Sequence, residues 1–348
     1  MEASTPPTTP ALNDSRADNP RSGKRWRGWA WFLAVLLVVS VCVNLVLWGR
    51  YDEYYAGSEP PEERFYDGNR TAEAKIARIT VAGTIMPPFT GRILKSLKRA
   101  EEDPAVRGVL LIVDSPGGLV ADSHEIYHRL KSLRAKKPVV VSMRRMAASG
   151  GLYVAMGAGP EGLIFAEPTT WTGSIGVIIP RYEFTELAEK LGVDPGSLKT
   201  GPMKDSLNPI RPLTEKEIEV WNAILTDSFD RFINVIDENR TQLDEAKIRE
   251  LATGQIYTAD QALDVGLVDR IGFEEDALAA LLEQLELTDP RVIEYEFPGG
   301  LLDLLMPAAK AANPQSRLRN ALDQSGPSAF YHCGGPTLSA DWILHQFP

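Results

Sequence analysis

Histidine and cysteine are both scarce in this sequence of 348 residues. The two cysteines, Cys42 and Cys333, lie in an apolar stretch near the amino end and close to the carboxyl end, respectively. Their separation argues against a disulfide framework, and neither lies in the central region, where a cysteine–histidine peptidase would need one. The four histidines stand at positions 124, 128, 332 and 345, so none lies between Ser149 and Tyr331. A Ser-His-Asp triad would need an imidazole from the first pair or from the tail.

Positive charge is also in short supply. There are 37 lysines and arginines against 47 aspartates and glutamates, which gives a formal net charge of -10. This balance argues against nucleic acid as a partner. The length allows one large domain or two small ones with appendages, and we expect neither a cofactor nor a metal.

The amino-terminal region predicts a membrane anchor. Residues 1–28 are polar at first and then basic, which predicts a disordered cytoplasmic tail. Residues 29–49 carry no charge, match the roughly 20 residues that cross a bilayer core, and have tryptophans at both ends. A cleaved signal peptide is the alternative, but its apolar region would be shorter. Because positive charge stays inside, we expect a single-pass protein of the inner (cytoplasmic) membrane with its amino terminus in the cytoplasm and its catalytic domain outside.

The rest of the chain divides into three regions. Residues 50–75 are polar and mostly acidic and predict a stalk. Residues 76–285 alternate between strand and helix patterns, and residues 286–348 are an appendage of unknown order, broken by prolines. Hydrophobic periodicity predicts strands over 76–81, 109–113, 139–143, 163–166 and 175–179, and helices over 91–102, 119–133, 183–191, 214–238 and 245–251. This order favours a mostly parallel α/β core with right-handed crossovers.

One small-residue turn is a candidate nucleophile site. Ser149 is flanked by two alanines and two glycines, directly after a β-rich run and before a possible helix. A serine on such a strand-to-helix turn can expose its hydroxyl, and the N–H of the following Gly150 can stabilise an oxyanion. The alternative is a tight turn with a helix-capping serine.

A second glycine-rich turn follows the apolar run 109–113. Its sequence is Asp-Ser-Pro-Gly-Gly over 114–118, so Gly117 and Gly118 lie between a buried strand and a helix. Free backbone N–H groups there could point at an incoming carbonyl oxygen. An ordinary Pro-Gly turn at a strand end is the alternative.

A serine without a histidine needs another base. Lysine serves if its amine is neutral near the working pH, and burial can lower its pKa by several units. The candidates are Lys199 and Lys204, and the local pattern does not choose between them. Ser174, in a further small-residue turn, either orients the lysine amine or is a turn hydroxyl.

One motif points to a different chemistry. His124, Glu125 and His128 match the H-E-x-x-H signature of zinc metallopeptidases, in which both histidines lie on one helical face and the glutamate acts as base. No further histidine continues the motif. The alternative is a pair of surface or interface histidines on an amphipathic helix.

Taken together, the ordered motifs resemble the bacterial signal peptide peptidase (protease IV) family, which are membrane-anchored Ser/Lys peptidases. The matching segments are 114–118, 146–153, 172–177, 199–205, 254–262 and 266–269, within about residues 75–285. The resemblance implies a crotonase-like fold shared with Clp proteases, plus one amino-terminal transmembrane helix. It also implies a homo-oligomeric ring in which neighbouring subunits complete each Ser–Lys pair.

Residue roles follow from the same resemblance. It implies Ser149 as nucleophile, Lys204 as general base and Ser174 as the serine that holds the lysine. Gly150, with Gly117 or Gly118, matches the oxyanion-hole donors. The implied substrates are signal peptides left in the membrane after cleavage, and possibly other membrane-proximal peptides.

Three other functions stay open on the sequence alone. The first is the zinc metallopeptidase. The second is a catalytically inactive crotonase-like scaffold at the membrane. The third is an acyl-CoA crotonase, in which the anchor and the Ser–Lys set would have no purpose.

Overall fold

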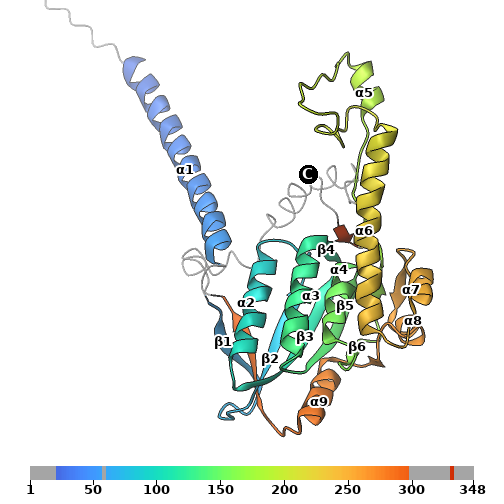
Figure 1. Cartoon of the computed structure of the whole chain (residues 1–348). Helices are drawn as coiled ribbons and strands as arrows, with labels where there is room; N and C mark the ends of the chain where they lie inside the picture. Colours follow the sequence, from blue (N-terminus) through green and yellow to red (C-terminus); the bar gives the residue numbers. More distant parts are fainter. Residues whose placement is uncertain (1–20, 57–59, 298–329, 333–348) are drawn as a thin grey trace, which may run out of the picture.

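One mixed sheet forms the centre of the computed structural model, which describes residues 21–56, 60–297 and 330–332 (Figure 1). Its main path runs β1-β10-β2-β3-β5-β6-β9, and β7 pairs with both β5 and β8. The strands are β1 (Glu62–Gly68), β2 (Lys75–Ala82), β3 (Val106–Ser115), β5 (Val139–Ala148), β6 (Ile164–Ala166), β7 (Trp171–Gly173), β8 (Ile256–Thr258), β9 (Arg270–Ile271) and β10 (Arg291–Glu296). Two further strands, β4 (Gly117–Leu119) and β11 (Phe330–His332), pair with each other.

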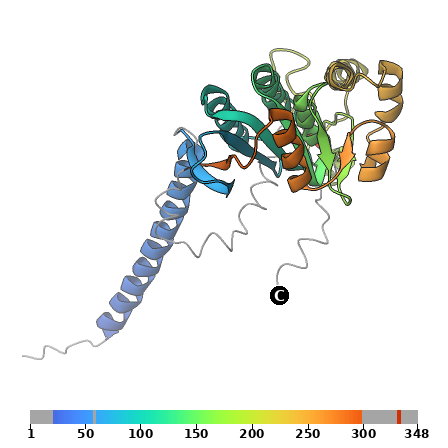
Figure 2. The ribbon, with the colours of Figure 1, turned by 90° about the horizontal axis from the view of Figure 1, so that it is seen from below.

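Helices cover both faces of this sheet (Figure 2). They are α2 (Phe89–Glu102), α3 (Val120–Arg134), α4 (Gly150–Ala155), α5 (Thr185–Lys190), α6 (Glu215–Asn239), α7 (Glu245–Leu251), α8 (Ala259–Asp264) and α9 (Glu274–Leu285), with a 3-10 turn at Met156–Ala158. Most consecutive core strands run parallel, as the βα repeats predict.

Strand β3 shows how the two faces are filled. Val109, Leu111 and Val113 point into the larger apolar cluster, which includes residues of α2, α3, α4 and α6. Leu110 and Ile112 point to the other face, against α9. Alternate residues of a strand point to opposite faces, so a continuous apolar run fits a strand buried on both sides.

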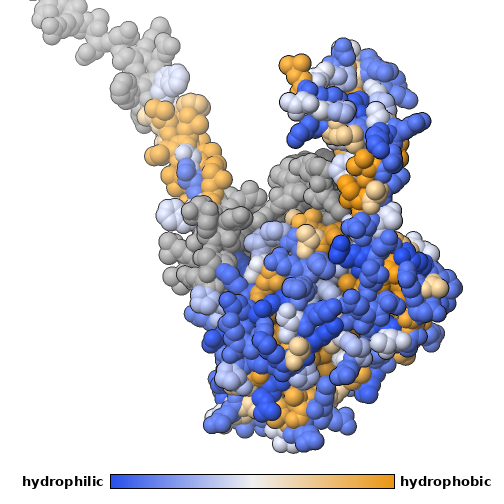
Figure 3. All heavy atoms as spheres, viewed as in Figure 1, coloured by the Kyte–Doolittle hydropathy of each residue, from blue (hydrophilic) through white to orange (hydrophobic). Residues whose placement is uncertain are grey.

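Helix α1 (Arg21–Ala56) stands apart from the sheet (Figure 1). Its stretch Gly28–Leu45 is 18 residues long and apolar enough to cross a membrane. The side chains described there are exposed, and they form an apolar surface along the helix (Figure 3). A single amino-terminal helix of this kind is what the sequence predicts; the expected tail over 1–20 lies outside the described residues.

Two of the predicted strands differ in the structure. The strand expected over 139–143 continues to Ala148, because its second half changes partner from β6 to β7. The prediction of a strand over 175–179 was wrong. The strand in this part of the chain is β7, which ends earlier, at Gly173. Gly173 and Ser174 both adopt positive φ, at 84° and 52°, and this left-handed turn takes the chain out of the sheet before Ile175.

The sheet includes two strands from outside residues 76–285, the range that the sequence predicts for the α/β core. Strand β1 lies within the stretch expected to form the stalk, and β10 lies within the stretch expected to form the appendage. The two pair antiparallel, and β10 also pairs parallel with β2. Of the rest of the appendage, residues 298–329 and 333–348 lie outside the described residues.

A long projection leaves the main body at one end (Figure 1). The carboxyl-terminal half of α6 is buried in the core through Phe232, Ile233 and Ile236. Its amino-terminal half is more open, with Ile218 and Ile224 exposed. The chain between β7 and α6 extends from that end and carries the short helix α5.

Candidate active site

Ser149 lies between the end of β5 and the start of α4, in a strained conformation. Its φ is 54° and its ψ is -115°. A non-glycine residue in such a region costs about 1–3 kcal/mol and persists only where its surroundings impose it. Here the Ser149 N–H donates to the Gly173 carbonyl (2.7 Å), and the Ser149 carbonyl accepts from the Tyr153 N–H (2.9 Å). The turn is thereby fixed from β7 on one side and α4 on the other.

The hydroxyl of Ser149 is the most unusual group at this turn. The residue is fully buried, and its Oγ has no hydrogen-bond partner within the described part of the chain. Burying a hydroxyl without a partner costs about 1–3 kcal/mol. A buried hydroxyl without a partner on a strained turn is typical of a nucleophile in the absence of its base and its substrate.

Three glycines lie against this turn. A Cβ placed on Gly150 would lie 3.1 Å from the Gly118 nitrogen and 3.2 Å from the Gly117 Cα. A Cβ on Gly118 would collide with the Ile85 carbonyl. The close approach of these backbones therefore requires glycine, and it brings the two glycine-rich motifs of the sequence together.

The backbone contacts distinguish Gly117 from Gly118. The Gly117 N–H donates to the Ser115 Oγ (3.1 Å), so this group is already used. Ile85 bonds to the neighbours of Gly118, donating to the Gly117 carbonyl and accepting from the Leu119 N–H (both 2.9 Å). Because successive N–H groups of a strand point to opposite edges, the Gly118 N–H faces away from Ile85, toward the edge where β11 lies.

Ser174 also lies close to Ser149. It follows Gly173, whose carbonyl accepts the Ser149 N–H, and its own N–H donates to the Gln255 carbonyl (2.6 Å). Its φ of 52° and its burial mark a second imposed turn. Five of the six site residues expected from the sequence thus lie at the ends of β4, β5 and β7.

Lys204, the sixth, lies elsewhere in this chain. It is an exposed residue of the projection. The loop that carries it is attached to the first turns of α6 through Glu217 and Trp221. Phe232 of the same helix packs against Tyr153 of α4, with ring centroids 5.0 Å apart. At 1.5 Å per residue, Glu217 and Phe232 are roughly 20 Å apart along α6. Within this chain, Lys204 is therefore remote from Ser149.

The two candidate lysines have different surroundings. Lys199 forms an ion pair with Asp205 (2.6 Å). The amine of Lys204 has no hydrogen bond or ion pair to any residue that the structure describes. Because its amine is already held by Asp205, Lys199 is the poorer candidate for the base.

Known proteins match the same region. The sequence profile of peptidase family S49 matches residues 131–288, and that of Clp protease matches residues 62–170. A putative signal peptide peptidase SppA of Enterococcus faecium is 37% identical over 265 residues, which cover 73% of this chain and 75% of the relative. The chain belongs to the S49 peptidase family.

Further known proteins match parts of this chain. A putative protease of Synechocystis is 42% identical over 65% of this chain and 83% of its own length. Protease 4 of Haemophilus influenzae is 32% identical over 59% of this chain, but over only 34% of its own length. A solved structure, a point mutant of ClpP1 from Listeria monocytogenes, aligns with 58% of this chain and 94% of its own at 19% identity and a TM-score of 0.41. The expected Clp protease-like α/β core is confirmed by the Clp protease match, and the chain is a serine peptidase by family.

The histidine motif has another role in this S49 chain. The Nδ1 of His124 lies 2.7 Å from the Tyr153 hydroxyl, and burial lowers the pKa of His124. Within the described ranges, no group of three or more His, Cys, Asp or Glu side chains could hold a metal ion. The pair with Tyr153 ties α3 to the helix that follows Ser149, and the zinc alternative gains no support.

Sequence reasoning missed two buried serines that shape the site. The Ser115 Oγ donates to the Gly83 carbonyl (2.6 Å) and accepts from Gly117, which fixes the turn before β4. The Ser123 Oγ donates to the Leu119 carbonyl (2.9 Å) and lies 2.5 Å from where a Cβ on Gly150 would be. Ser115 falls inside a motif quoted from the sequence, whereas Ser123 carries no sequence signal beyond its place on a helix.

Proposed function

We propose that this S49 peptidase is a membrane-tethered endopeptidase with a Ser/Lys dyad, in which Ser149 is the nucleophile and Lys204 of a neighbouring copy is the general base. The observation that carries the proposal is the buried Ser149 hydroxyl, which has no partner in the described part of the chain and lies beside the backbones of Gly118 and Gly150. Among the described residues no proton acceptor contacts this hydroxyl, and Lys204 is exposed on a projection away from its own Ser149.

The reaction would run in two halves. Lys204 takes the hydroxyl proton as Ser149 Oγ attacks the peptide carbonyl, and the N–H groups of Gly118 and Gly150 stabilise the oxyanion. Lys204 then returns the proton to the leaving amine as the C–N bond breaks. In the second half it takes a proton from water, which attacks the acyl ester, and it returns that proton to Ser149 Oγ as the ester C–O bond breaks. Ser174 holds the lysine amine in place.

A second copy is the proposed source of the lysine because the projection exposes a group of large apolar side chains. Outside α1, the exposed large apolar residues are concentrated there: Ile178, Tyr182, Phe184, Leu187, Leu191, Val193 and Leu198. A monomer that leaves so many apolar side chains in water along one segment is expected to cover them with a partner. A ring of copies would both bury this segment and deliver Lys204 to the next subunit.

Residues 330–332 support an extended peptide as the substrate. They pair antiparallel with β4, so that Tyr331 is opposite Gly118 and His332 is opposite Gly117, and β11 also contacts α4. The edge of β4 nearest Ser149 therefore accepts an extended backbone. Pairing of this kind binds a peptide through its main chain, which fits an endopeptidase that accepts varied sequences.

The substrate and location follow from the relatives and from α1. One relative is named as a putative signal peptide peptidase, and the span Gly28–Leu45 could anchor the chain in the bilayer. With the basic residues before this span in the cytoplasm, the peptidase region lies outside the cytoplasm. Remnant signal peptides are apolar and membrane-bound, and an enzyme tethered at the membrane would meet them there.

A serine-directed acylating probe tests the dyad. We expect one probe per active chain, attached at Ser149 as found by peptide mass spectrometry. Labelling should fall strongly in Lys204→Ala, because the hydroxyl then has no base. Labelling at another residue, or equal labelling of both proteins, would remove Ser149 and Lys204 from these roles.

The pairing of β11 with β4 makes a further prediction. Ser149 is fully buried while β11 lies along β4, so we expect a substrate peptide to compete with residues 330–332 for this edge. Tyr331→Pro removes a backbone N–H from the pairing strand. We expect KM for a peptide substrate to fall several-fold while kcat stays the same. An unchanged or higher KM would show that the two do not compete.

A further inference from the structure

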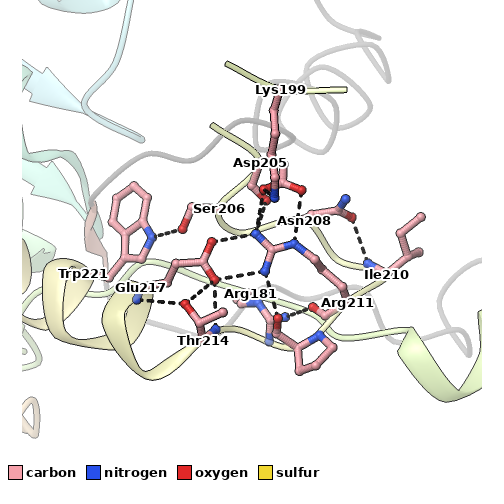
Figure 4. A network of polar contacts seen from close by, with 11 residues as sticks. Arg181, Lys199, Asp205, Ser206, Asn208, Ile210, Arg211, Thr214, Glu217 and Trp221 are labelled. Atoms are coloured by element: carbon pink, nitrogen blue, oxygen red, sulfur yellow. Dashed lines mark hydrogen bonds and ion pairs between the residues drawn. The ribbon is translucent and has the colours of Figure 1, made fainter. Parts of the chain in front are cut away.

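One arginine fastens the loop that carries Lys204 to helix α6 (Figure 4). The Arg211 guanidinium donates to both oxygens of Asp205, at 2.8 Å and 3.2 Å, and to the Asp205 carbonyl at 3.0 Å. It also donates to both oxygens of Glu217, at 2.6 Å and 2.9 Å. A single guanidinium thus joins the carboxylate next to Lys204 to a carboxylate on the first turn of α6.

Glu217 is a fixed anchor for this contact. Its side chain is only 1% exposed, and it closes the capping box of α6 by accepting from the N–H (2.9 Å) and the hydroxyl (3.0 Å) of Thr214. A second attachment comes from the Trp221 indole N–H, which donates to the Ser206 Oγ (2.7 Å). The two residues that directly follow Lys204 are therefore both bound to α6.

The same contacts orient the Asp205 carboxylate, the negative charge next to Lys204 in the sequence. Hydrogen bonds from Arg211 first, and from Lys199 second, lower the pKa of Asp205 to about 2, so this carboxylate is charged at any working pH. It bonds to Arg211 and to Lys199 (2.6 Å) and leaves the neighbouring Lys204 amine alone. A carboxylate released beside that amine would stabilise its protonated form, which cannot act as a base.

We propose that Arg211 is a positioning residue for the Lys204 amine: it holds the loop on α6 and keeps the Asp205 carboxylate from pairing with Lys204. The inference rests on the proposed function of Lys204. It assigns to Arg211 no contact with substrate, because the guanidinium is fully engaged by Asp205, Glu217 and the Pro212 carbonyl.

The charges around the loop are consistent with this role. The cations are Lys199, Arg181 and Arg211, and the anions are Asp205, Glu183 and Glu217 of α6. Glu217 is held by Arg211, Glu183 by Arg181, and the Arg181 guanidinium also donates to the Arg211 carbonyl (2.7 Å). Each anion already has a cationic partner, and removing Arg211 leaves Asp205, the one next to Lys204, with Lys199 as its remaining cation.

The test compares pH–rate profiles of the full-length protein on a peptide substrate. For Arg211→Gln we expect kcat/KM at neutral pH to fall roughly 10- to 100-fold, less than the roughly 100- to 10,000-fold that a general base usually contributes. We also expect the acid limb of the profile to move to higher pH, because Asp205, then held by Lys199 alone, can turn toward Lys204 and favour its ammonium form. Unfolding temperature and oligomer size, measured alongside, show whether the variant is folded.

A double variant separates charge from shape. In Arg211→Gln/Asp205→Asn the released group is neutral, so the acid limb should return toward that of the wild type. Lys199→Gln is the matched control, because it removes the other cation from Asp205 but leaves Arg211 in place. The acid limb of its pH–rate profile should stay near that of the wild type. The proposal would be overturned if Arg211→Gln lost activity while the acid limb of its pH–rate profile stayed in place and the double variant restored nothing.

The failure of this inference can be told apart from failure of the proposed function. If Lys204→Ala is inactive while Arg211→Gln keeps full activity, Arg211 has no positioning role and the dyad stands. If Lys204→Ala itself keeps full activity, Lys204 is not the base and both proposals fall.

Discussion

Replacing Ser149 by alanine is expected to lower peptide hydrolysis by at least about a thousandfold, because it removes the proposed nucleophile. The same change should not harm folding. The Ser149 hydroxyl has no partner within the described residues, so alanine loses no hydrogen bond there and removes a buried polar atom. We expect the free energy of unfolding to rise by about 1 kcal/mol. Hydrolysis assays and thermal unfolding of the same preparation measure both effects.

Ser142→Ala is a matched control for that variant. Ser142 lies on the same strand, β5, and also has a buried hydroxyl without a partner in the described part of the chain. It lies within the strand, before the turn that carries Ser149. We expect a similar gain in stability and unchanged hydrolysis. If both variants lost activity equally, or if Ser149→Ala stayed active, Ser149 would not be the nucleophile.

The parts of the fold that the sequence predicts well are those with local causes. The apolar run in β3 signals a strand buried on both faces, and Thr214 with Glu217 signals the start of α6 through a capping box. Strands β1 and β10 were missed because they pair across more than two hundred residues of chain. A polar edge strand such as β1 also lacks the apolar alternation on which such a prediction depends.

In the candidate site, too, the residues that the sequence predicts well are those with a local cause. Ser149, Gly150 and Gly118 come from short motifs whose small residues are required by close backbone contacts, and the structure places these contacts around one turn. The choice between Lys199 and Lys204 has no such local cause. It depends on which lysine Asp205 holds, and Asp205 is in turn held by Arg211. A network of side chains from different parts of a loop cannot be derived from spacing alone.

Replacing Lys204 by alanine is expected to reduce kcat roughly 100- to 10,000-fold, the usual contribution of a general base. The side chain is exposed and makes no hydrogen bond or ion pair to a described residue, so stability should not change. Lys199→Ala is the control on the same loop, and it should keep most of the activity. A large loss in Lys199→Ala with activity retained in Lys204→Ala would reverse the assignment.

Mixing the two inactive variants tests whether the dyad forms between copies. The Ser149→Ala and Lys204→Ala chains are co-expressed so that they assemble together. If each site joins two copies, a site is intact when a Lys204→Ala chain supplies Ser149 and the neighbouring Ser149→Ala chain supplies Lys204. At equal amounts and random order this holds for about a quarter of the sites, so about a quarter of wild-type activity should return. A dyad within one chain would be broken in every copy. Absence of recovery in a purified mixed assembly would place Lys204 with its own Ser149, and the projection would then have to fold back across the roughly 20 Å of α6 that separates them here.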